Sequence, residues 1–474
     1  MTHETPPDEL RRRFDALHAA FAREPNPDAS VRRDRLARLL AMTRERERDF
    51  VEAIDRDFGH RSSHETRLAE LYIVTAGTRY AIANVRRWMR PQRIATPIQL
   101  LPGSARILPQ PLGVAGIVSP WNYPVQLALA PAIGALAAGN RVMLKPSEVT
   151  PATSALLAEA IAQRFAPDEF TVVTGGAETG AAFARLPFDH LFFTGSTAVG
   201  RIVAKAAAEN LTPVTLELGG KSPAIVDAGA DLAVVAPRIA VGKLLNAGQT
   251  CIAPDYALVP ERKADAFVEA VKRAMGRLYP DPLRGPDYTA IVNARHYERL
   301  VALVEDARAK GATIVSIPEG AAPDPETRRI PPTLVVGANE SMQLMHEEIF
   351  GPILPVERYA RLDDAIAAVT RRPRPLACYV FAEDRAVRDR ILHETIAGGV
   401  TVNDTLWHFA HEELPFGGVG ASGIGAYHGE AGFRTFSHMK SVFVQPRRTA
   451  ATLLAPPYGA TFEKVLALLK RISG

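Results

Sequence analysis

A cysteine at position 251 is the side chain of this sequence best suited to act as a nucleophile. A run with helical apolar spacing leads to Gly248, and Pro254 prevents a helix from continuing beyond the cysteine. Cys251 is therefore expected on a loop between packed elements, where a thiol can meet a substrate. The second cysteine, Cys378, lies in a short apolar run that predicts a buried strand, so we expect it to be a core residue.

Two polar residues elsewhere could assist such a thiol. Glu217 ends a predicted strand between two leucines, where loss of solvation raises a carboxyl pKa toward the range of a general base. A buried ion pair is the alternative for Glu217. Asn122 follows Trp121, and its amide could face a developing oxyanion, although asparagine is also an ordinary turn residue. The residue pattern leaves both alternatives open.

A glycine-containing turn between a predicted strand and a predicted helix could bind a pyrophosphate. Its residues Gly195, Ser196 and Gly200 would let backbone amides at the helix start face the anion. The spacing is not G-x-G-x-x-G, and such turns are common, so the turn alone decides nothing. Lys145 and Glu148, just beyond another strand, could bond the hydroxyls of an adenosine ribose. A carboxylate there would repel a 2′-phosphate, which favours NAD and leaves NADP as the second choice.

The order of the predicted elements places these residues together. Helices are expected over about 8–90, extended pieces over 91–106, and strands alternating with helices over 113–217. This alternation predicts an α/β fold with a Rossmann-like, doubly wound parallel sheet. The polar residues named above follow strands, and the carboxyl ends of parallel strands share one edge. A second α/β segment is expected from 221 to about 400, followed by a glycine-rich stretch and a strand near 437–446.

Composition narrows the classes of function. The chain has 474 residues, 47 % of them hydrophobic, and a formal charge of +4, which predicts two or three globular domains. Its arginine runs are interleaved with acidic residues and lack aromatic residues, so we expect no nucleic acid partner. The N-terminus lacks the pattern of a signal peptide, and no apolar run reaches about 18 residues. We expect a cytoplasmic protein without a membrane span.

Several motifs together resemble one family, the NAD(P)-dependent aldehyde dehydrogenases. They occur in that family's order and spacing between about residues 30 and 446. They are Pro-Trp-Asn-Tyr-Pro (120–124), Lys-Pro-Ser-Glu (145–148), Phe-Thr-Gly-Ser-Thr-Ala-Val-Gly (193–200), Leu-Glu-Leu-Gly-Gly-Lys (216–221), Gly-Gln-Thr-Cys (248–251), Glu-Ile-Phe-Gly-Pro (348–352) and Pro-Phe-Gly-Gly (415–418). The resemblance implies the aldehyde dehydrogenase fold and an enzyme that oxidises a small-molecule aldehyde.

The resemblance also implies residue roles. Cys251 looks like the nucleophile, Glu217 like the general base that hydrolyses a thioester, and Asn122, with the Cys251 backbone amide, like the oxyanion donor. The cofactor contacts implied are Lys145, Glu148, Gly195, Ser196, Gly200, Glu348 and Phe350, with Glu348 on the nicotinamide ribose. No metal site is implied. The motifs around 248–256 and 423–429 resemble the class-three and coniferyl aldehyde branch.

Substrate, domain and assembly expectations follow from the same resemblance. Tyr123, Trp407, Phe409 and Phe416 are expected to line a tunnel, with Ala130 as a small residue in it, and a hydrophobic aldehyde, aromatic or medium-chain, is the expected substrate. We expect an NAD-binding domain (1–90 and 111–220), a catalytic domain (221–400), bridging strands (91–110 and 437–446), a closing segment (401–436) and a tail helix (447–474). The bridging strands suggest a homodimer, and the amphipathic tail helix is expected to dock on its own protein.

Two rival functions remain at this stage. A coenzyme A-acylating dehydrogenase would pass the acyl group to a thiol and would not need Glu217. A non-catalytic structural relative would lack at least one of Cys251, Glu217 and Asn122, all of which are present.

Overall fold

A layer of amphipathic helices forms the start of the chain in this computed structural model, which describes residues 4–447 and 449–473. The elements are α1 (Pro7–Arg23), α2 (Ala29–Glu45), α3 (Glu47–Phe58), α4 (Ser63–Thr66), a π-helical turn (Arg67–Tyr72) and α5 (Ile73–Trp88). Their boundaries have local causes. The Asp28 side chain accepts hydrogen bonds from the first amides of α2, and Gly59 ends α3 with a left-handed φ of 76°.

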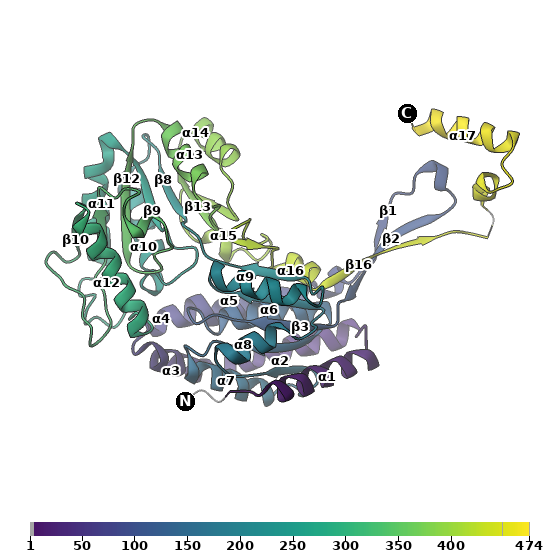
Figure 1. Ribbon diagram of the computed structural model, residues 1–474, viewed down its shortest axis with the longest axis horizontal. Coiled ribbons are helices and arrows are strands. Elements are labelled where there is room, and N and C mark those ends of the chain that lie inside the picture. Colours follow the sequence, from purple (N-terminus) through teal and green to yellow (C-terminus); the bar gives the residue numbers. More distant parts are fainter. Residues whose placement is uncertain (1–3, 448, 474) are drawn as a thin grey trace.

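A six-stranded sheet lies against this layer (Figure 1). In spatial order its strands are β15 (Gly423–Ile424), β7 (Val214–Glu217), β6 (His190–Thr194), β3 (Val114–Val118), β4 (Arg141–Lys145) and β5 (Phe170–Val172). The connecting helices are α6 (Gln126–Ala138), α7 (Pro151–Ala162), α8 (Ala177–Ala184) and α9 (Thr197–Ala208). All pairings are parallel except that of β15 with β7. The predicted doubly wound sheet is confirmed, while α8 was not predicted.

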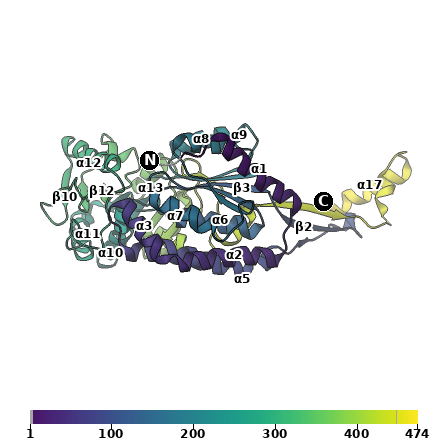
Figure 2. The same cartoon turned by 90° about the horizontal axis from the view of Figure 1, so that it is seen from below.

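Both faces of this sheet are covered by helices, which explains why the central residues of its strands are mainly apolar. Val142 and Leu144 of β4 pack in the core shared with α2, α3, α5, α6 and α7, whereas Met143 packs with α1, α8 and α9. Figure 2 shows the two groups of helices on opposite sides of the sheet. Parallel sheets buried on both faces need such continuous apolar runs.

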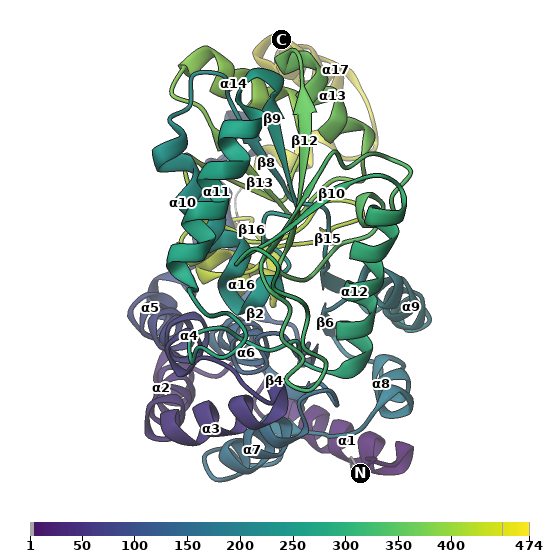
Figure 3. The same cartoon turned by 90° about the vertical axis from the view of Figure 1, so that its left-hand side faces the viewer.

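A second, seven-stranded sheet lies beyond the first (Figure 3). Its spatial order is β10 (Thr313–Ser316), β11 (Thr333–Val336), β12 (Ile353–Tyr359), β9 (Tyr256–Pro260), β8 (Pro223–Val226), β13 (Ala377–Phe381) and β14 (Gly399–Val402). Its helices are α10 (Leu232–Leu244), α11 (Ala264–Leu278), α12 (Ala294–Ala309), α13 (Leu362–Arg371) and α14 (Arg385–Glu394). Cys378 is fully buried in β13, so the prediction that it is a core residue is confirmed.

A three-stranded arm projects from the body and carries the end of the chain (Figure 1). Its strands are β1 (Gln92–Ile94), β2 (Ser104–Pro111) and β16 (Ser437–Val444), all antiparallel, and β16 is preceded by α15 (Trp407–Ala410) and α16 (Gly429–Thr435). Beyond the arm lies α17 (Ala460–Ser473), reached through a 3-10 turn (Ala450–Leu454). Further 3-10 turns span Ile98–Leu100, Leu245–Gly248, Glu261–Lys263 and Gln343–Met345.

The tail helix corrects one expectation. We expected α17 to dock on its own protein, but none of its described side chains is buried, and Leu468 and Ile472 are 56 % and 48 % exposed. Figure 1 shows it beyond the arm and away from the body. The apolar stripe predicted from the sequence is present, and Phe462, Val465, Leu466 and Leu469 are half-buried, but α17 contacts the neighbouring 3-10 turn rather than the body of the protein.

Candidate active site

The loop that carries Cys251 leaves α10 through residues with unusual backbone angles. Asn246, Ala247 and Gly248 are all left-handed, with φ values of 55°, 50° and 75°. Gly248 excludes a side chain, because a Cβ there would lie 2.2 Å from the Gly351 carbonyl oxygen. Left-handed backbone is costly for the other two residues and persists only where surrounding contacts enforce it. The turn leaves Cys251 partly exposed to a cavity.

Asn122 lies behind this loop and holds it in place. Its Nδ2 donates a hydrogen bond to the Gln249 backbone carbonyl oxygen at 3.1 Å. The backbone carbonyl oxygen of Asn122 accepts one from Asn246 Nδ2 at 2.9 Å. The Tyr123 hydroxyl lies 2.7 Å from Thr250 Oγ1. The structure therefore places Asn122 against the residues that precede Cys251. Gln249 accepts one Nδ2 hydrogen, and no described residue accepts the other.

A buried charged cluster that sequence reasoning missed supports Asn122 from behind. Arg61 Nη1 donates to the Asn122 carbonyl oxygen at 2.9 Å and lies 3.0 Å from Glu70 Oε1, with both side chains fully buried. Glu65 accepts the Asn246 backbone N–H at 3.1 Å. Burial raises the pKa of both glutamates, and the Arg61 charge opposes that rise. Charged residues on a predicted helix look like a solvated face, so no local pattern indicated this cluster.

Glu217 ends β7 and faces the same cavity as Cys251. It is 3 % exposed, and neither carboxylate oxygen has a hydrogen-bond partner among the described residues. Burial therefore raises the pKa of Glu217 well above its usual value. Burial also raises the pKa of the Cys251 thiol, and the charges of Glu348 and Glu217 raise it further. An unpaired carboxyl and a thiol thus face the same cavity. No described cation forms an ion pair with Glu217, so the structure does not support the ion-pair alternative.

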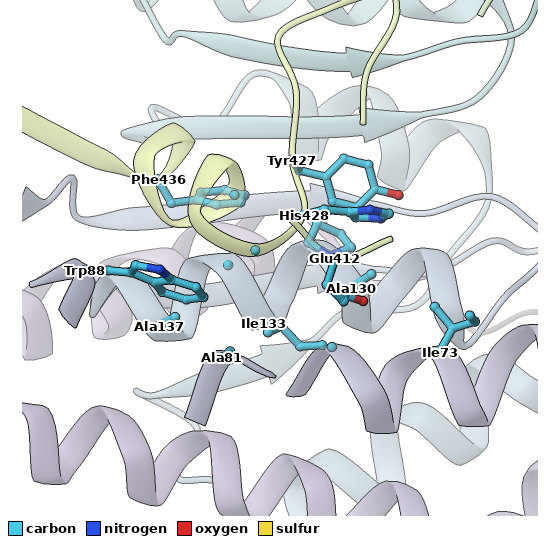
Figure 4. A pocket seen from close by; sticks show the side chains of 15 residues that line it. Ile73, Ala81, Trp88, Ala130, Ile133, Ala137, Glu412, Tyr427, His428 and Phe436 are labelled. Carbon is cyan, nitrogen blue, oxygen red and sulfur yellow. The ribbon is translucent and has the colours of Figure 1, made fainter. Parts of the chain in front are cut away.

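The cavity is a tunnel of about 490 Å³ with mainly apolar walls. All four expected substrate residues line it, namely Tyr123, Trp407, Phe409 and Phe416. Phe409 and Phe416 meet edge to face with ring centroids 4.9 Å apart, and Trp407 is 65 % exposed. The expectation for Ala130 is wrong. Ala130 belongs to α6 and lines a separate, smaller cavity (Figure 4). The helical position could not reveal which of two neighbouring cavities this side chain faces.

The expected cofactor residues lie along the edge of the six-stranded sheet. Lys145 Nζ donates to Glu148 Oε2 at 2.8 Å, and Lys145 is 4 % exposed. Ser196 caps α9 by accepting the Val199 backbone N–H at 3.3 Å. The Gly195 N–H donates to the Glu217 backbone carbonyl oxygen at 3.0 Å. This bond joins the turn that follows β6 to the end of β7, the strand that carries Glu217.

Two further expected contacts sit closer to the cysteine. Burial raises the pKa of Glu348 to about 8, and its carboxylate packs so tightly on Gly219 that a Cβ there would lie 1.9 Å from Oε2. Phe350 has a left-handed φ of 55° and meets Trp121 edge to face at 5.4 Å. Gly200 lies in α9, where a Cβ would come 2.6 Å from the Leu218 side chain.

These residues fit an adenine dinucleotide on structural grounds. The α9 N-terminus presents free amides and a positive dipole end, as a pyrophosphate requires. Lys145 and Glu148 offer a donor and an acceptor beyond β4, and the Glu148 carboxylate opposes a 2′-phosphate. The half-buried Glu348 carboxyl lies near Cys251. A nicotinamide ring that reaches the thiol would bring its own ribose into this region, so Glu348 could bind that ribose.

The sequence matches the model of the aldehyde dehydrogenase family over residues 2–442. The chain belongs to the aldehyde dehydrogenase family. It is an enzyme with that family's fold, as the resemblance of its motifs implied. A probable coniferyl aldehyde dehydrogenase of Pseudomonas aeruginosa is 51 % identical over 460 residues, which are 97 % of this chain and 96 % of that protein. The expected resemblance to the coniferyl aldehyde branch is confirmed.

Solved structures of aldehyde dehydrogenases agree with this assignment. A substrate-bound structure of Staphylococcus aureus AldH is 40 % identical and superposes with a TM-score of 0.93, covering 97 % of this chain and 99 % of that one. A Mycobacterium tuberculosis aldehyde dehydrogenase complexed with NAD+ is 29 % identical, with a TM-score of 0.84 and coverage of 94 % and 92 %. Within residues 4–447 and 449–473, no helix has the length and apolar character needed to cross a membrane.

Proposed function

We propose that this enzyme oxidises a hydrophobic aldehyde to its carboxylic acid with NAD, through a thioester on Cys251 that is hydrolysed with Glu217 as base. The observation that carries the proposal is the tunnel itself. It brings a partly exposed thiol and an unpaired buried carboxyl to one apolar space, with Asn122 fixed beside the nucleophile loop. A substrate carbonyl in that space would meet a nucleophile, an oxyanion donor and a base.

The first half of the reaction forms the thioester. Cys251 Sγ loses its proton to solvent in the tunnel and attacks the aldehyde carbon, and the carbonyl oxygen takes up the negative charge next to the Asn122 amide and the Cys251 backbone N–H. The C=O bond then re-forms as the hydrogen on that carbon leaves as hydride, which gives the thioester. Burial and the charges of Glu348 and Glu217 raise the pKa of the thiol, so the proton has to leave Sγ as the C–S bond forms. When bound, oxidised NAD would supply the acceptor for this hydride.

The second half releases the acid. Glu217 takes a proton from a water molecule, the resulting hydroxide attacks the thioester carbon, and Cys251 leaves as a thiolate. The raised pKa of Glu217 suits this role, since a stronger base takes the proton more readily. A coenzyme A-acylating enzyme would have no use for this unpaired carboxyl. We therefore favour hydrolysis over acyl transfer.

The tunnel walls support an aromatic or medium-chain substrate. Trp407, Phe409 and Phe416 give flat apolar surfaces toward the mouth, and Tyr123 lies near the thiol. A similar chain is described as a probable coniferyl aldehyde dehydrogenase, and an aryl propenal of that kind fits such walls. We infer the same class of substrate for this enzyme.

The domain roles expected from the sequence remain part of the proposal. The helical layer with the six-stranded sheet would bind NAD, the seven-stranded sheet would present Cys251, and the 401–436 segment would close the tunnel. The arm exposes Ile98 (64 %) and Phe443 (46 %), which suits pairing with a second subunit, so we propose a homodimer.

The deciding experiment is turnover of the purified enzyme with an aldehyde panel, comparing aryl propenals, medium-chain alkanals and acetaldehyde, with NAD or NADP and with or without coenzyme A. We expect the free acid as product whether or not coenzyme A is present, fastest turnover with a hydrophobic aldehyde and NAD, and no turnover by Cys251→Ser. Acyl-coenzyme A as the main product, or normal turnover by Cys251→Ser, would overturn the proposal.

A further inference from the structure

The first described residues of the chain lie beside the proposed cofactor site. Thr5 donates its backbone N–H and its hydroxyl to the Thr174 carbonyl oxygen, at 3.1 and 2.6 Å, and it is only 8 % exposed. Thr174 follows β5, whose parallel neighbour β4 ends at Lys145. The start of the chain is therefore held at the sheet edge where the expected contacts to the adenosine ribose lie.

Glu4 caps the N-terminus of α8 from a distant part of the chain. Its Oε1 accepts a hydrogen bond from the Gly176 backbone N–H at 2.8 Å, and its Oε2 accepts one from the Thr179 hydroxyl. The fit is close, because a Cβ on Gly176 would lie 2.8 Å from Glu4 Oε1. An amide at a helix start and a nearby hydroxyl are donors that a phosphate group can use. Here a carboxylate of the same chain takes both.

Lys145 connects this cap to the cofactor site. Its Cε would lie 3.9 Å from a Cβ on Gly180, which is one helical turn after Gly176 in α8. Its ammonium donates to Glu148 Oε2 at 2.8 Å. The hydrogen bonds at α8 lower the pKa of Glu4, and the Lys145 charge lowers it further. Glu4 is therefore ionised at neutral pH and lies near the same lysine as Glu148.

A phosphate on the adenosine ribose would meet these groups. The proposed NAD site places that ribose on Lys145 and Glu148, so a 2′-phosphate would lie beside the same lysine. The donors named above are already taken, since Glu148 accepts from the ammonium and Glu4 from the amide and hydroxyl of α8. A 2′-phosphate would therefore have to displace a carboxylate to reach a donor, and it would be repelled by two negative charges.

A purely structural role, in which Glu4 only fastens the start of the chain, is the alternative. Glutamine separates the two roles. Its oxygen can still accept from Gly176, and its amide can donate to the Thr179 hydroxyl, which can then donate to the Thr5 carbonyl oxygen at 3.3 Å. Glu4→Gln therefore keeps the cap and removes only the charge.

We propose that Glu4 is a specificity-determining residue that makes the enzyme select NAD over NADP. Its carboxylate occupies the donors at the start of α8 and repels a phosphate on the adenosine ribose. The 2′-hydroxyl of NAD is neutral and is not repelled. Glu4 thus adds to the effect expected of Glu148. The inference rests on the proposed NAD site at Lys145 and Glu148.

The test is a calorimetric titration of NAD and of NADP without aldehyde, since the two cofactors differ only in the 2′-phosphate. The proteins are the wild type, Glu4→Gln, Glu4→Lys and the control Asp8→Asn, which removes an exposed charge from the first turn of α1. We expect Glu4→Gln to bind NADP about fivefold more tightly or more, the effect of one unit charge about 4 Å away in water, with NAD binding unchanged. Glu4→Lys should tighten NADP binding further, and Asp8→Asn should change neither dissociation constant.

Three results would overturn the proposal: wild-type enzyme that binds NADP as tightly as NAD, unchanged NADP binding in Glu4→Gln, or an equal change for both dinucleotides. The last result would show that Glu4 only holds the start of the chain in place. The titration does not depend on catalysis. Failure of the proposed function would instead appear as absence of acid product from the wild-type enzyme with either dinucleotide.

Discussion

Replacing Glu217 by glutamine tests the central step of the proposed reaction. Because neither carboxylate oxygen has a partner in the described structure, glutamine breaks no hydrogen bond of the fold and keeps the shape of the side chain. The variant should therefore fold and bind substrates normally. What it loses is the base that takes a proton from the hydrolytic water.

The expected magnitude follows from that loss. General base catalysis contributes about 10²–10⁴-fold, which raises the barrier to deacylation by about 3–5 kcal/mol. Acylation does not use this base, and the neutral amide also removes a charge that raises the pKa of Cys251. The first NADH should therefore form at the wild-type rate or faster, while steady-state turnover falls about a hundredfold or more.

Stopped-flow recording of NADH separates the two steps. Glu217→Gln should give a burst close to one NADH per active site followed by very slow turnover, and the acyl enzyme should accumulate as a mass increase on the chain. Glu217→Asp, which keeps the charge and shortens the reach, should fall between the two. A burst that is lost together with turnover, or turnover that is unchanged, would refute the assignment of Glu217 as the deacylation base.

Three further variants test other parts of the structure. Asn122→Ala should lower kcat about a hundredfold or more through loss of an oxyanion donor, with a smaller change in KM, and unchanged kcat would contradict that role. Glu148→Gln should raise kcat/KM with NADP relative to NAD, because it removes a charge that repels the 2′-phosphate, and an unchanged ratio would place that phosphate elsewhere. The pKa of Glu412 is about 7 in the fold and 4.5 as a free side chain, so folding loses stability as the pH rises from about 4.5 to about 7, and the whole loss is present above that range. Glu412→Gln should therefore raise the free energy of unfolding by about 3 kcal/mol at pH 8 and leave it unchanged at pH 4, measured by urea titration.

Much of the fold was predictable because its signals are local. Strand and helix alternation over 113–217 follows from apolar runs, a proline at the start of α7 and turn residues, each acting within a few positions. The helix α8 was missed, because glycines flank a short segment with little apolar periodicity.

The tail and the small cavity show where local signals stop. The apolar stripe of α17 predicts a helix but carries no information on which surface covers it. Ala130 lies on a helix buried on nearly every side, so its position in the sequence could not tell which of two neighbouring cavities it faces. Arg61 and Glu70 look like solvated charges until the fold closes around them.

Residue types and local patterns were enough to identify the chemical groups of this enzyme and the order along the chain of the strands that carry them. Cys251, Glu217 and Asn122 could be selected from residue type and local pattern, since a strand end or a turn is set by neighbouring residues. Three features became visible only in the folded chain: a thiol and an unpaired carboxyl share a tunnel, Arg61 supports Asn122, and Tyr427 lines two cavities. These facts depend on contacts between segments far apart in the chain, and burial and pKa are properties of those contacts rather than of any single segment.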